Sequence, residues 1–206
     1  GGEIEAECFN AATVSIDFYG IPCHLGAARG KMVNSVSMAV SFIAAVPRDE
    51  SPESTDGRYG YYSVDDIKGT IEHTSVTFHL RDFDITQLHR RIDALKSLAT
   101  TTQLLFPGGK VEMKEDIVYT NMADAIKANP EVMDSIWSAG KVAGLSLYEK
   151  IIRGGTDGAR LSAMGIPTPN IFTGGHNLHS RFEWLSLNEA VESATLIKEI
   201  VHYWAK

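Results

Sequence analysis

The sequence has few of the residues that mark a disulfide-rich, membrane-spanning or nucleic-acid-binding protein. Its only two cysteines, Cys8 and Cys23, supply neither a disulfide framework nor a zinc-finger ligand set. No apolar run approaches the roughly 20 residues that cross a bilayer, and no cleavable signal pattern is present. The formal net charge of −7 argues against the basic face of a nucleic-acid binder. These absences predict a soluble, cytoplasmic protein that binds neither nucleic acid nor a membrane.

Familiar catalytic loops are missing as well. The sequence has no Walker loop and no G-x-G-x-x-G run for a nucleotide, and no G-x-S-x-G turn for a serine nucleophile. What remains is the composition of an ordinary globular protein, 44% hydrophobic and 22% charged over 206 residues. A chain of this length can bury a proper core, in one domain or two.

Residues 11–120 carry the periodicities of one α+β unit. Alternating apolar and polar side chains predict strands at 11–21 and 70–82, and further strands are expected at 59–68 and 110–118. Apolar residues at helical spacing predict helices at 33–46 (Val36, Ala39, Val40 and Ile43) and 85–98, with a polar loop at 48–58. The order β-α-β-β-α-β is that of a ferredoxin-like split βαβ layer, an antiparallel sheet with helices on one face.

Residues 121–206 have a different rhythm. We expect a helix at 131–143, a strand at 147–152, a helix at 156–164, a strand at 168–172 and a closing helix at 187–204. Strand–helix–strand alternation with short loops implies parallel pairing. Two strands make a poor sheet alone, so this half indicates a portion of a larger, incomplete α/β domain. Residues 1–10 would be its connecting strand, and residues 11–120 a domain inserted into it.

The run Arg153-Gly154-Gly155-Thr156-Asp157-Gly158 joins a predicted strand to a predicted helix. Its two adjacent glycines allow a sharp turn, and Thr156 or Asp157 can cap the helix by accepting from its free N–H groups. A helix N-terminus beside the Arg153 guanidinium favours an anion such as a carboxylate or phosphate. The alternative is a tight strand-to-helix turn with an exposed arginine and no ligand.

Two histidines, His176 and His179, lie close together in a segment rich in glycine and asparagine. A catalytic zinc ion usually has three protein ligands, and Glu183 is near enough in sequence to bind such an ion or to support one of its ligands. For a loop histidine, hydrogen bonding is the commoner role. The spacing therefore leaves both metal binding and hydrogen bonding open.

His24 follows the first predicted strand, and Arg81 lies at the end of another. A neutral imidazole at a strand end can polarise a carbonyl group or donate to an oxyanion; an ordinary surface histidine is the alternative. Arg81 can clamp a carboxylate, or else pair with Asp82 or Asp84. The remaining histidines fall within regular elements and are expected to be structural: His73, His79, His89 and His202.

Several motifs occur in the order found in one family of zinc enzymes. They are Phe9-Asn10-Ala11-Ala12, His24-x-Gly26 through Met32-Val33-Asn34, Asp49-Glu50-Ser51-Pro52-Glu53, Arg81-Asp82-Phe83-Asp84, Arg153-Gly154-Gly155-Thr156-Asp157-Gly158, and Thr173-Gly174-Gly175-x-Asn177-x-His179. By these motifs, which extend over essentially the whole chain, the sequence resembles the M20 zinc metallopeptidases, most closely their aminotripeptidases. Leu25 stands where proline is common in that family.

The resemblance implies a catalytic α/β domain that holds two zinc ions, with an inserted ferredoxin-like lid that often forms a homodimer. It implies that His179 is a zinc ligand and that His24 helps to bind the scissile carbonyl or its oxyanion. It further implies that Arg153, Gly154, Gly155 and Thr156 recognise the carboxylate of a peptide substrate. Arg81 is similar to a lid arginine that assists in substrate binding.

The other zinc ligands of the family are absent, because the sequence has no His-x-Asp motif and no Glu-Glu pair. We therefore expect the C-terminal portion of an aminotripeptidase that releases the N-terminal residue of tripeptides. Without a missing N-terminal segment that carries the remaining ligands and the general base, this portion should be inactive. Exposed apolar faces should make the isolated chain aggregation-prone or dimeric. The alternatives are a dimerising ferredoxin-like binding module and a different M20 hydrolase, such as a dipeptidase or deacylase.

Overall fold

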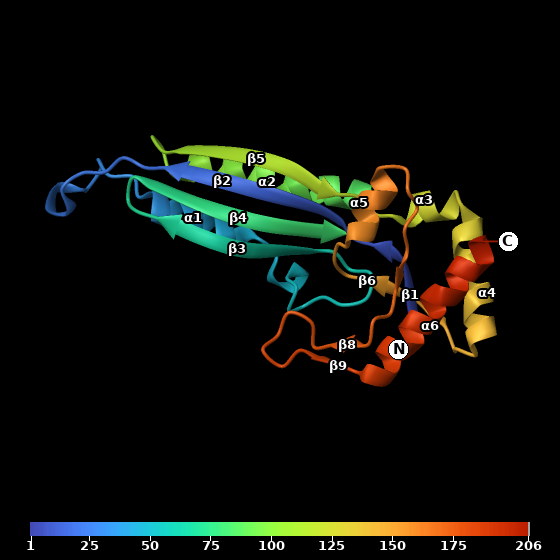
Figure 1. Ribbon diagram of the computed structural model, residues 1–206. Coiled ribbons are helices and arrows are strands. Elements are labelled where there is room, and N and C mark those ends of the chain that lie inside the picture. The colour runs from blue at the N-terminus through green and yellow to red at the C-terminus, as the bar shows by residue number, and fades with distance from the viewer. Residues whose placement is uncertain (206) are drawn as a thin grey trace. The chain divides into compact units, whose positions relative to one another are not determined.

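The computed structural model describes residues 1–205, which form two compact units. Unit 1 contains Gly1–Cys8 and the residues from Thr120 onward, and unit 2 contains Phe9–Tyr119 (Figure 1). Both units combine helices with a β-sheet, so the predicted mixture of α and β structure is confirmed. In the part of the chain that the structure describes, no helix has the length and apolar character needed to cross a membrane.

Unit 2 is built on a four-stranded antiparallel sheet. Its strands are β2 (Asn10–Tyr19), β3 (Tyr61–Gly69), β4 (His73–Asp82) and β5 (Lys110–Tyr119), in the order β3-β4-β2-β5. From Ala12 onward the central strand β2 buries every second side chain, including Val14, Ile16 and Phe18. A slip of one residue would move all three to the opposite face, so this alternation determines the register of β2.

Helices α1 (Ser35–Ala45) and α2 (Ile85–Leu105) cover one face of this sheet (Figure 1). Each begins at a side chain that accepts a backbone N–H: Asn34 accepts from Val36 at 2.9 Å, and Asp84 accepts from Thr86 at 2.7 Å. Helix α2 is longer than predicted, because it continues past residue 98 to Leu105. Two short 3-10 helices, η1 (Leu25–Ala27) and η2 (Arg48–Glu50), lie in the loops of this unit.

The buried face of α1 includes only some of the apolar residues whose spacing predicted the helix. Val40 is one of the apolar residues at helical spacing that predicted this helix, and its side chain is 56% exposed. Ser35, Met38, Ala39 and Phe42 are the buried residues of the helix. The helix is apolar on most sides, so periodicity alone does not distinguish the side that faces the sheet.

Unit 1 has a three-stranded sheet in the order β6-β1-β7. Its strands are β1 (Glu3–Cys8), β6 (Tyr148–Ile152) and β7 (Asn170–Ile171); its helices are α3 (Ala123–Lys127), α4 (Pro130–Ala143), α5 (Asp157–Ala163) and α6 (Leu187–Trp204). The core of the unit joins the sheet to α4 and α6 through Ile4, Ile136, Ala139, Phe172 and Leu196. A separate small pair, β8 (Gly175–His176) and β9 (Trp184–Leu185), completes the unit and was not predicted.

The predicted parallel pairing of the two strands around α5 is wrong. β1 separates β6 from β7, and it runs parallel to β6 but antiparallel to β7. Gly165 follows α5 with a φ of 90°, a left-handed conformation that lets the chain reverse direction before β7. The sheet therefore combines one parallel pair and one antiparallel pair, which strand–helix–strand alternation alone does not predict.

Candidate functional site

The turn from Arg153 to Gly158 lies between β6 and α5 in unit 1. Thr156 occupies the N-cap position of α5, but its side chain makes no capping bond, so the predicted cap by this residue is wrong. Its Oγ1 is buried and has no hydrogen-bond partner among residues 1–205. A buried hydroxyl without a partner is unfavourable, and a bound ligand or water molecule would satisfy it.

The glycines of this turn have different surroundings. A Cβ atom on Gly154 would meet no atom within 4 Å, which leaves its backbone open to a ligand. A Cβ on Gly158 would stand 2.4 Å from the carbonyl oxygen of Thr168 and 3.0 Å from Oδ1 of Asn170. Gly158 is therefore required for packing, whereas Gly154 keeps one side of the turn accessible.

His179 lies in the loop between β8 and β9, also in unit 1. Its φ is 64°, and Asn177 in the same loop has a φ of 54°. Left-handed backbone is uncommon for residues other than glycine and gathers at functional sites. The backbone N–H of His179 donates to Oε2 of Glu183 at 2.9 Å. Glu183 therefore contacts the backbone of His179 through a hydrogen bond.

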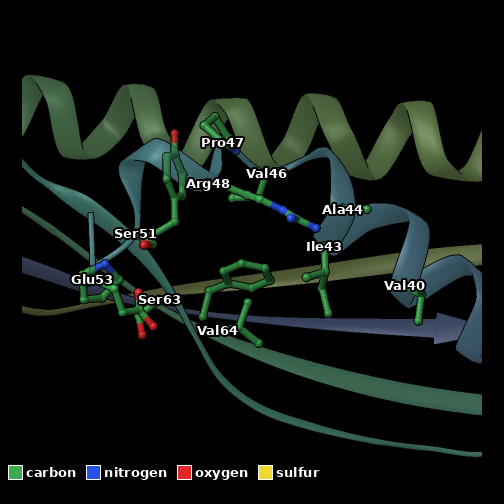
Figure 2. A pocket seen from close by; sticks show the side chains of 13 residues that line it. Val40, Ile43, Ala44, Val46, Pro47, Arg48, Ser51, Glu53, Ser63 and Val64 are labelled. Atoms are coloured by element: carbon green, nitrogen blue, oxygen red, sulfur yellow. The ribbon is translucent and has the colours of Figure 1, made fainter. Parts of the chain in front are cut away.

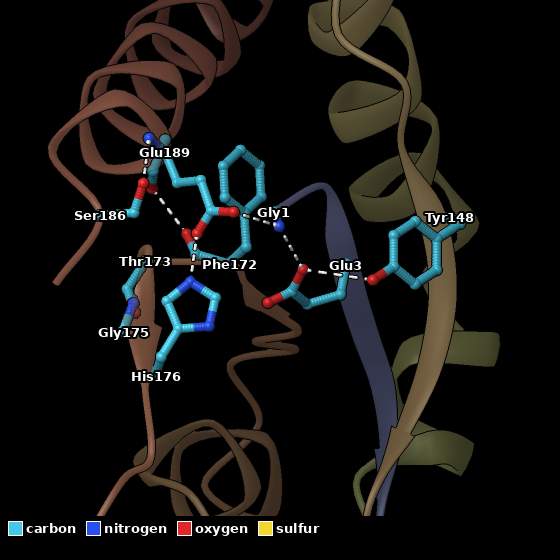
Figure 3. A network of polar contacts seen from close by, with 10 residues as sticks. Gly1, Glu3, Tyr148, Phe172, Thr173, Gly175, His176, Ser186 and Glu189 are labelled. Atoms are coloured by element: carbon cyan, nitrogen blue, oxygen red, sulfur yellow. Dashed lines mark hydrogen bonds and ion pairs between the residues drawn. The ribbon is translucent and has the colours of Figure 1, made fainter. Parts of the chain in front are cut away.

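His176 is held on two sides. Its ring stacks on Trp184 with the centroids 4.2 Å apart, and its Nε2 lies 2.7 Å from Oε2 of Glu189 (Figure 3). The same carboxylate accepts from the amino group of Gly1 at 2.9 Å. Sequence analysis did not select Glu189, although Ser186-x-x-Glu189 has the form of a capping box before α6.

His24 lies in unit 2, just after β2, as the N-cap of η1. Its Nδ1 accepts the backbone N–H of Gly26 at 3.2 Å. In a neutral imidazole the other nitrogen, Nε2, then carries the proton. The side chain is exposed, so His24 can present Nε2–H as a donor.

Arg81 lies at the other end of the same sheet. Arg81 on β4 pairs with Ala11 near the start of β2, whereas His24 follows Tyr19, the last residue of β2. Ala11 and Tyr19 are eight residues apart on this strand, which corresponds to about 27 Å. The guanidinium donates to the carbonyl of Leu80 at 2.9 Å. The expected alternative of an ion pair with Asp82 or Asp84 is wrong, because Asp82 pairs with Arg91 and Asp84 caps α2. Within one chain, His24 and Arg81 are too far apart to touch the same tripeptide.

Residues 1–205 contain no group of three or more His, Cys, Asp or Glu side chains placed to hold a metal ion. His179 is therefore not part of a complete zinc site within this region. A catalytic zinc normally takes three protein ligands, so these residues do not fit the ion by themselves.

A pocket of about 390 Å³ lies between α1, the segment after it and β3 in unit 2 (Figure 2). Its lining is largely apolar and includes Val40, Ile43, Ala44 and Val64, with Arg48 and Glu53 as its charged members. Val64 is 41% exposed, as is expected of an edge strand that has no neighbour on one side. This pocket was not predicted from the sequence.

Comparisons with known proteins show what the chain is similar to. Residues 7–104 match the peptidase dimerisation domain of the M20 peptidases. The chain is therefore similar to the M20 peptidases. Its curated relatives include peptidase T of Exiguobacterium sibiricum, which is 40% identical over 205 residues; the match covers 100% of this chain and 50% of that protein. The chain spans about half the length of the curated relatives it matches.

Solved structures show the same fold. The aminopeptidase PepT from Bacillus cereus superposes with a TM-score of 0.80 at 22% identity, over 100% of this chain and 54% of that one. A tripeptidase from Staphylococcus aureus gives a TM-score of 0.82 at 18% identity, over 97% of this chain and 52% of its own. At these identities the likeness establishes the fold of the chain.

Proposed function

We propose that this chain is the C-terminal portion of an aminopeptidase that releases the N-terminal residue of tripeptides. The observation that carries the proposal is the buried, unpartnered hydroxyl of Thr156, in a turn whose Gly154 is open on one side. A peptide carboxylate placed against this turn would lie beside the Arg153 segment, and rotation of the Thr156 side chain would let its hydroxyl donate to that carboxylate. Gly155 completes the backbone of the proposed recognition turn.

The two cations and His24 have different proposed roles. Arg153 and Arg81 recognise the substrate. A carboxylate-binding site at a fixed position would limit the length of the peptide, because the substrate must end where the cations lie. His24 donates Nε2–H to the scissile carbonyl oxygen, where negative charge develops during hydrolysis. The wide separation of His24 from Arg81 along the sheet supports a dimer in which these two residues act on different substrate molecules.

We also propose that His179 is one zinc ligand of the complete enzyme. In such enzymes zinc supplies an activated water molecule when bound. The remaining ligands and the general base would come from polypeptide outside this sequence. The relatives are about twice the length of the matched segment, which supports this division.

A complementation experiment tests the proposal. The 206-residue chain is assayed for zinc content and tripeptide hydrolysis, first alone and then joined to the N-terminal half of the Exiguobacterium peptidase T. We expect neither tight zinc nor turnover from the chain alone, and both from the joined protein, with loss of turnover on Thr156→Val. Stoichiometric zinc or hydrolysis by the chain alone would contradict the proposed division of ligands. Retention of full activity by Thr156→Val would contradict the role of the hydroxyl.

The match to a dimerisation domain supports a second proposed function, in which unit 2 is a ferredoxin-like lid that forms a homodimer. The strand order β3-β4-β2-β5 and the helical connections α1 and α2 support this proposal. The exposed edge strand β3 and the apolar pocket beside it form a surface that a second copy would cover. We expect Val64→Lys to shift the chain toward monomer in light scattering. Val142→Lys, at an exposed valine of α4 in unit 1, is the matched control.

A further inference from the structure

The loop that carries His179 has a conformation that its own sequence does not favour. It connects β8 to β9, where His176 pairs with Trp184. Both Asn177 and His179 have positive φ angles, 54° and 64°. Asparagine adopts this region readily, whereas a histidine there needs support from its surroundings.

Hydrogen bonds inside the loop close it into a compact turn. The N–H of Ser180 donates to the carbonyl of Asn177 at 3.1 Å, and that of Glu183 donates to the carbonyl of Ser180 at 3.3 Å. The amide of Asn177 reaches the carbonyl of Phe182 at 3.4 Å. None of these bonds involves the backbone of His179 itself, so they do not determine its φ directly.

The bond that does act on His179 comes from a carboxylate. Oε2 of Glu183 accepts the His179 N–H at 2.9 Å. A hydrogen bond to a charged acceptor is stronger than one between neutral groups. The peptide plane before His179 is thereby held in one orientation, which limits the directions its imidazole can take.

A second carboxylate ties the start of the loop to α6. Nε2 of His176 lies 2.7 Å from Oε2 of Glu189 in the first turn of that helix. The stack of His176 on Trp184, with an angle of 16° between the rings, joins the two strands of the hairpin. Because His176 contacts both Trp184 and Glu189, the two ends of the loop are connected to α6.

We propose that Glu183 and His176 are positioning residues that together hold the loop 177–183 so that His179 is presented in a single orientation. Glu183 acts on the backbone of His179, and His176 anchors the hairpin to Glu189. The inference rests on the proposed role of His179 and adds two residues to it. From the sequence alone, the roles of Glu183 and His176 were open between metal binding and hydrogen bonding.

Amide hydrogen exchange of the 206-residue chain, followed residue by residue by NMR, tests the part played by Glu183. Loss of one hydrogen bond predicts that Glu183→Ala speeds exchange at His179 by about threefold or more. Glu183→Gln keeps an acceptor oxygen and should restore most of the protection. Glu192→Ala, at an exposed glutamate of α6, is the matched control and should leave exchange at His179 unchanged.

His176→Phe tests the second anchor, because it keeps a ring to stack on Trp184 and removes the bond to Glu189. Glu189 is left intact since it also accepts from Gly1. We expect faster exchange at Gly175 and across the loop, with no change in the middle of α6. Unchanged exchange at His179 in Glu183→Ala, or across the loop in His176→Phe, would overturn the corresponding half of the inference. Faster exchange throughout unit 1 would indicate general destabilisation and would also overturn it.

The exchange experiment needs neither metal nor substrate. If it fails while turnover of the joined enzyme still depends on His179, only the positioning inference is wrong. If exchange behaves as expected but His179→Ala leaves turnover of the joined enzyme intact, the proposed role of His179 is wrong instead.

Discussion

Arg91 and Asp82 form an ion pair in unit 2 that is largely shielded from solvent. Nε of Arg91 lies 3.0 Å from Oδ2 of Asp82, and the two side chains are only 14% and 9% exposed. The guanidinium also contacts Glu50 and stands 4.9 Å from the ring centre of Tyr62. One cation therefore connects α2 to the end of β4 and to the loop after α1.

Replacing Arg91 should destabilise unit 2. Arg91→Met leaves Asp82 buried without its cation, and breaking such a pair costs about 3 kcal/mol. Urea denaturation measures the change in the free energy of unfolding. Arg90→Met is the matched control, because Arg90 is the exposed neighbour on the same helix and its loss should cost less than about 0.5 kcal/mol. Equal losses in the two variants would show that the buried pair is not the cause.

Gly158 and Gly154 should respond differently to the same substitution. Gly158→Ala forces its new methyl group against the carbonyl oxygen of Thr168, 2.4 Å away, so we expect a loss of about 2 kcal/mol. Gly154→Ala meets no atom within 4 Å and should be neutral for folding. Thermal unfolding of the two variants provides the comparison. A stable Gly158→Ala protein would mean that the turn relaxes more easily than its contacts indicate.

Thr156 and Ser193 offer a contrast between two hydroxyl groups. Oγ of Ser193 donates to the carbonyl of Phe172 at 2.7 Å, so Ser193→Ala should cost about 1 kcal/mol. Thr156→Val removes a hydroxyl that has no partner among residues 1–205, and its stability should stay within about 0.5 kcal/mol of the parent. Chemical denaturation measures both. A large loss in Thr156→Val would indicate that the hydroxyl stabilises the fold and is not reserved for a ligand.

Glu5 predicts a dependence of stability on pH in unit 1. Burial raises the pKa of this carboxyl, while a hydrogen bond from Asn170 and the charge of Lys150 oppose the rise. A raised pKa means that the folded state prefers the protonated form. The favourable contribution of Glu5 to the free energy of unfolding is present below 4.5, the pKa of this carboxyl in the unfolded chain. It is lost as the pH rises through the higher pKa of the folded state.

Glu5→Gln removes that titration and should stabilise the chain at pH 7, by about 0.5 kcal/mol after allowance for solvent screening. The advantage over the parent should disappear as the pH falls below 4.5, where both side chains are neutral. Unfolding curves at pH 7 and at acidic pH give the two differences. A constant advantage at every pH would rule out the titration of Glu5 as its origin.

Helix α6 should make the isolated chain associate. Leu187, Val191 and Val201 are 74%, 58% and 60% exposed, and they follow the same side of the helix. Exposed apolar side chains of this kind promote association. We expect the combined variant Val191→Lys and Val201→Lys to give a smaller scattering mass than the parent chain. Lys198→Glu changes charge on the same helix without removing apolar surface and is the control.

Short-range patterns predicted most of the elements of this chain. The alternation in β2 and β4 and the apolar periodicity of α2 and α6 depend on residues that are close in sequence, so they can be read without a structure. The Arg153–Gly158 turn and His179 stood out for the same reason. Their roles in substrate and metal binding stay predictions.

The sequence by itself determined the elements of unit 2 and the residues worth testing, because periodicity and turn chemistry are local properties. Only the tertiary structure decided that β1 separates β6 from β7, that Asp82 pairs with Arg91 and not with Arg81, and that Glu183 holds the backbone of His179. Strand neighbours depend on how distant segments meet, and the choice of partner for a charged group depends on which groups become shielded from water together.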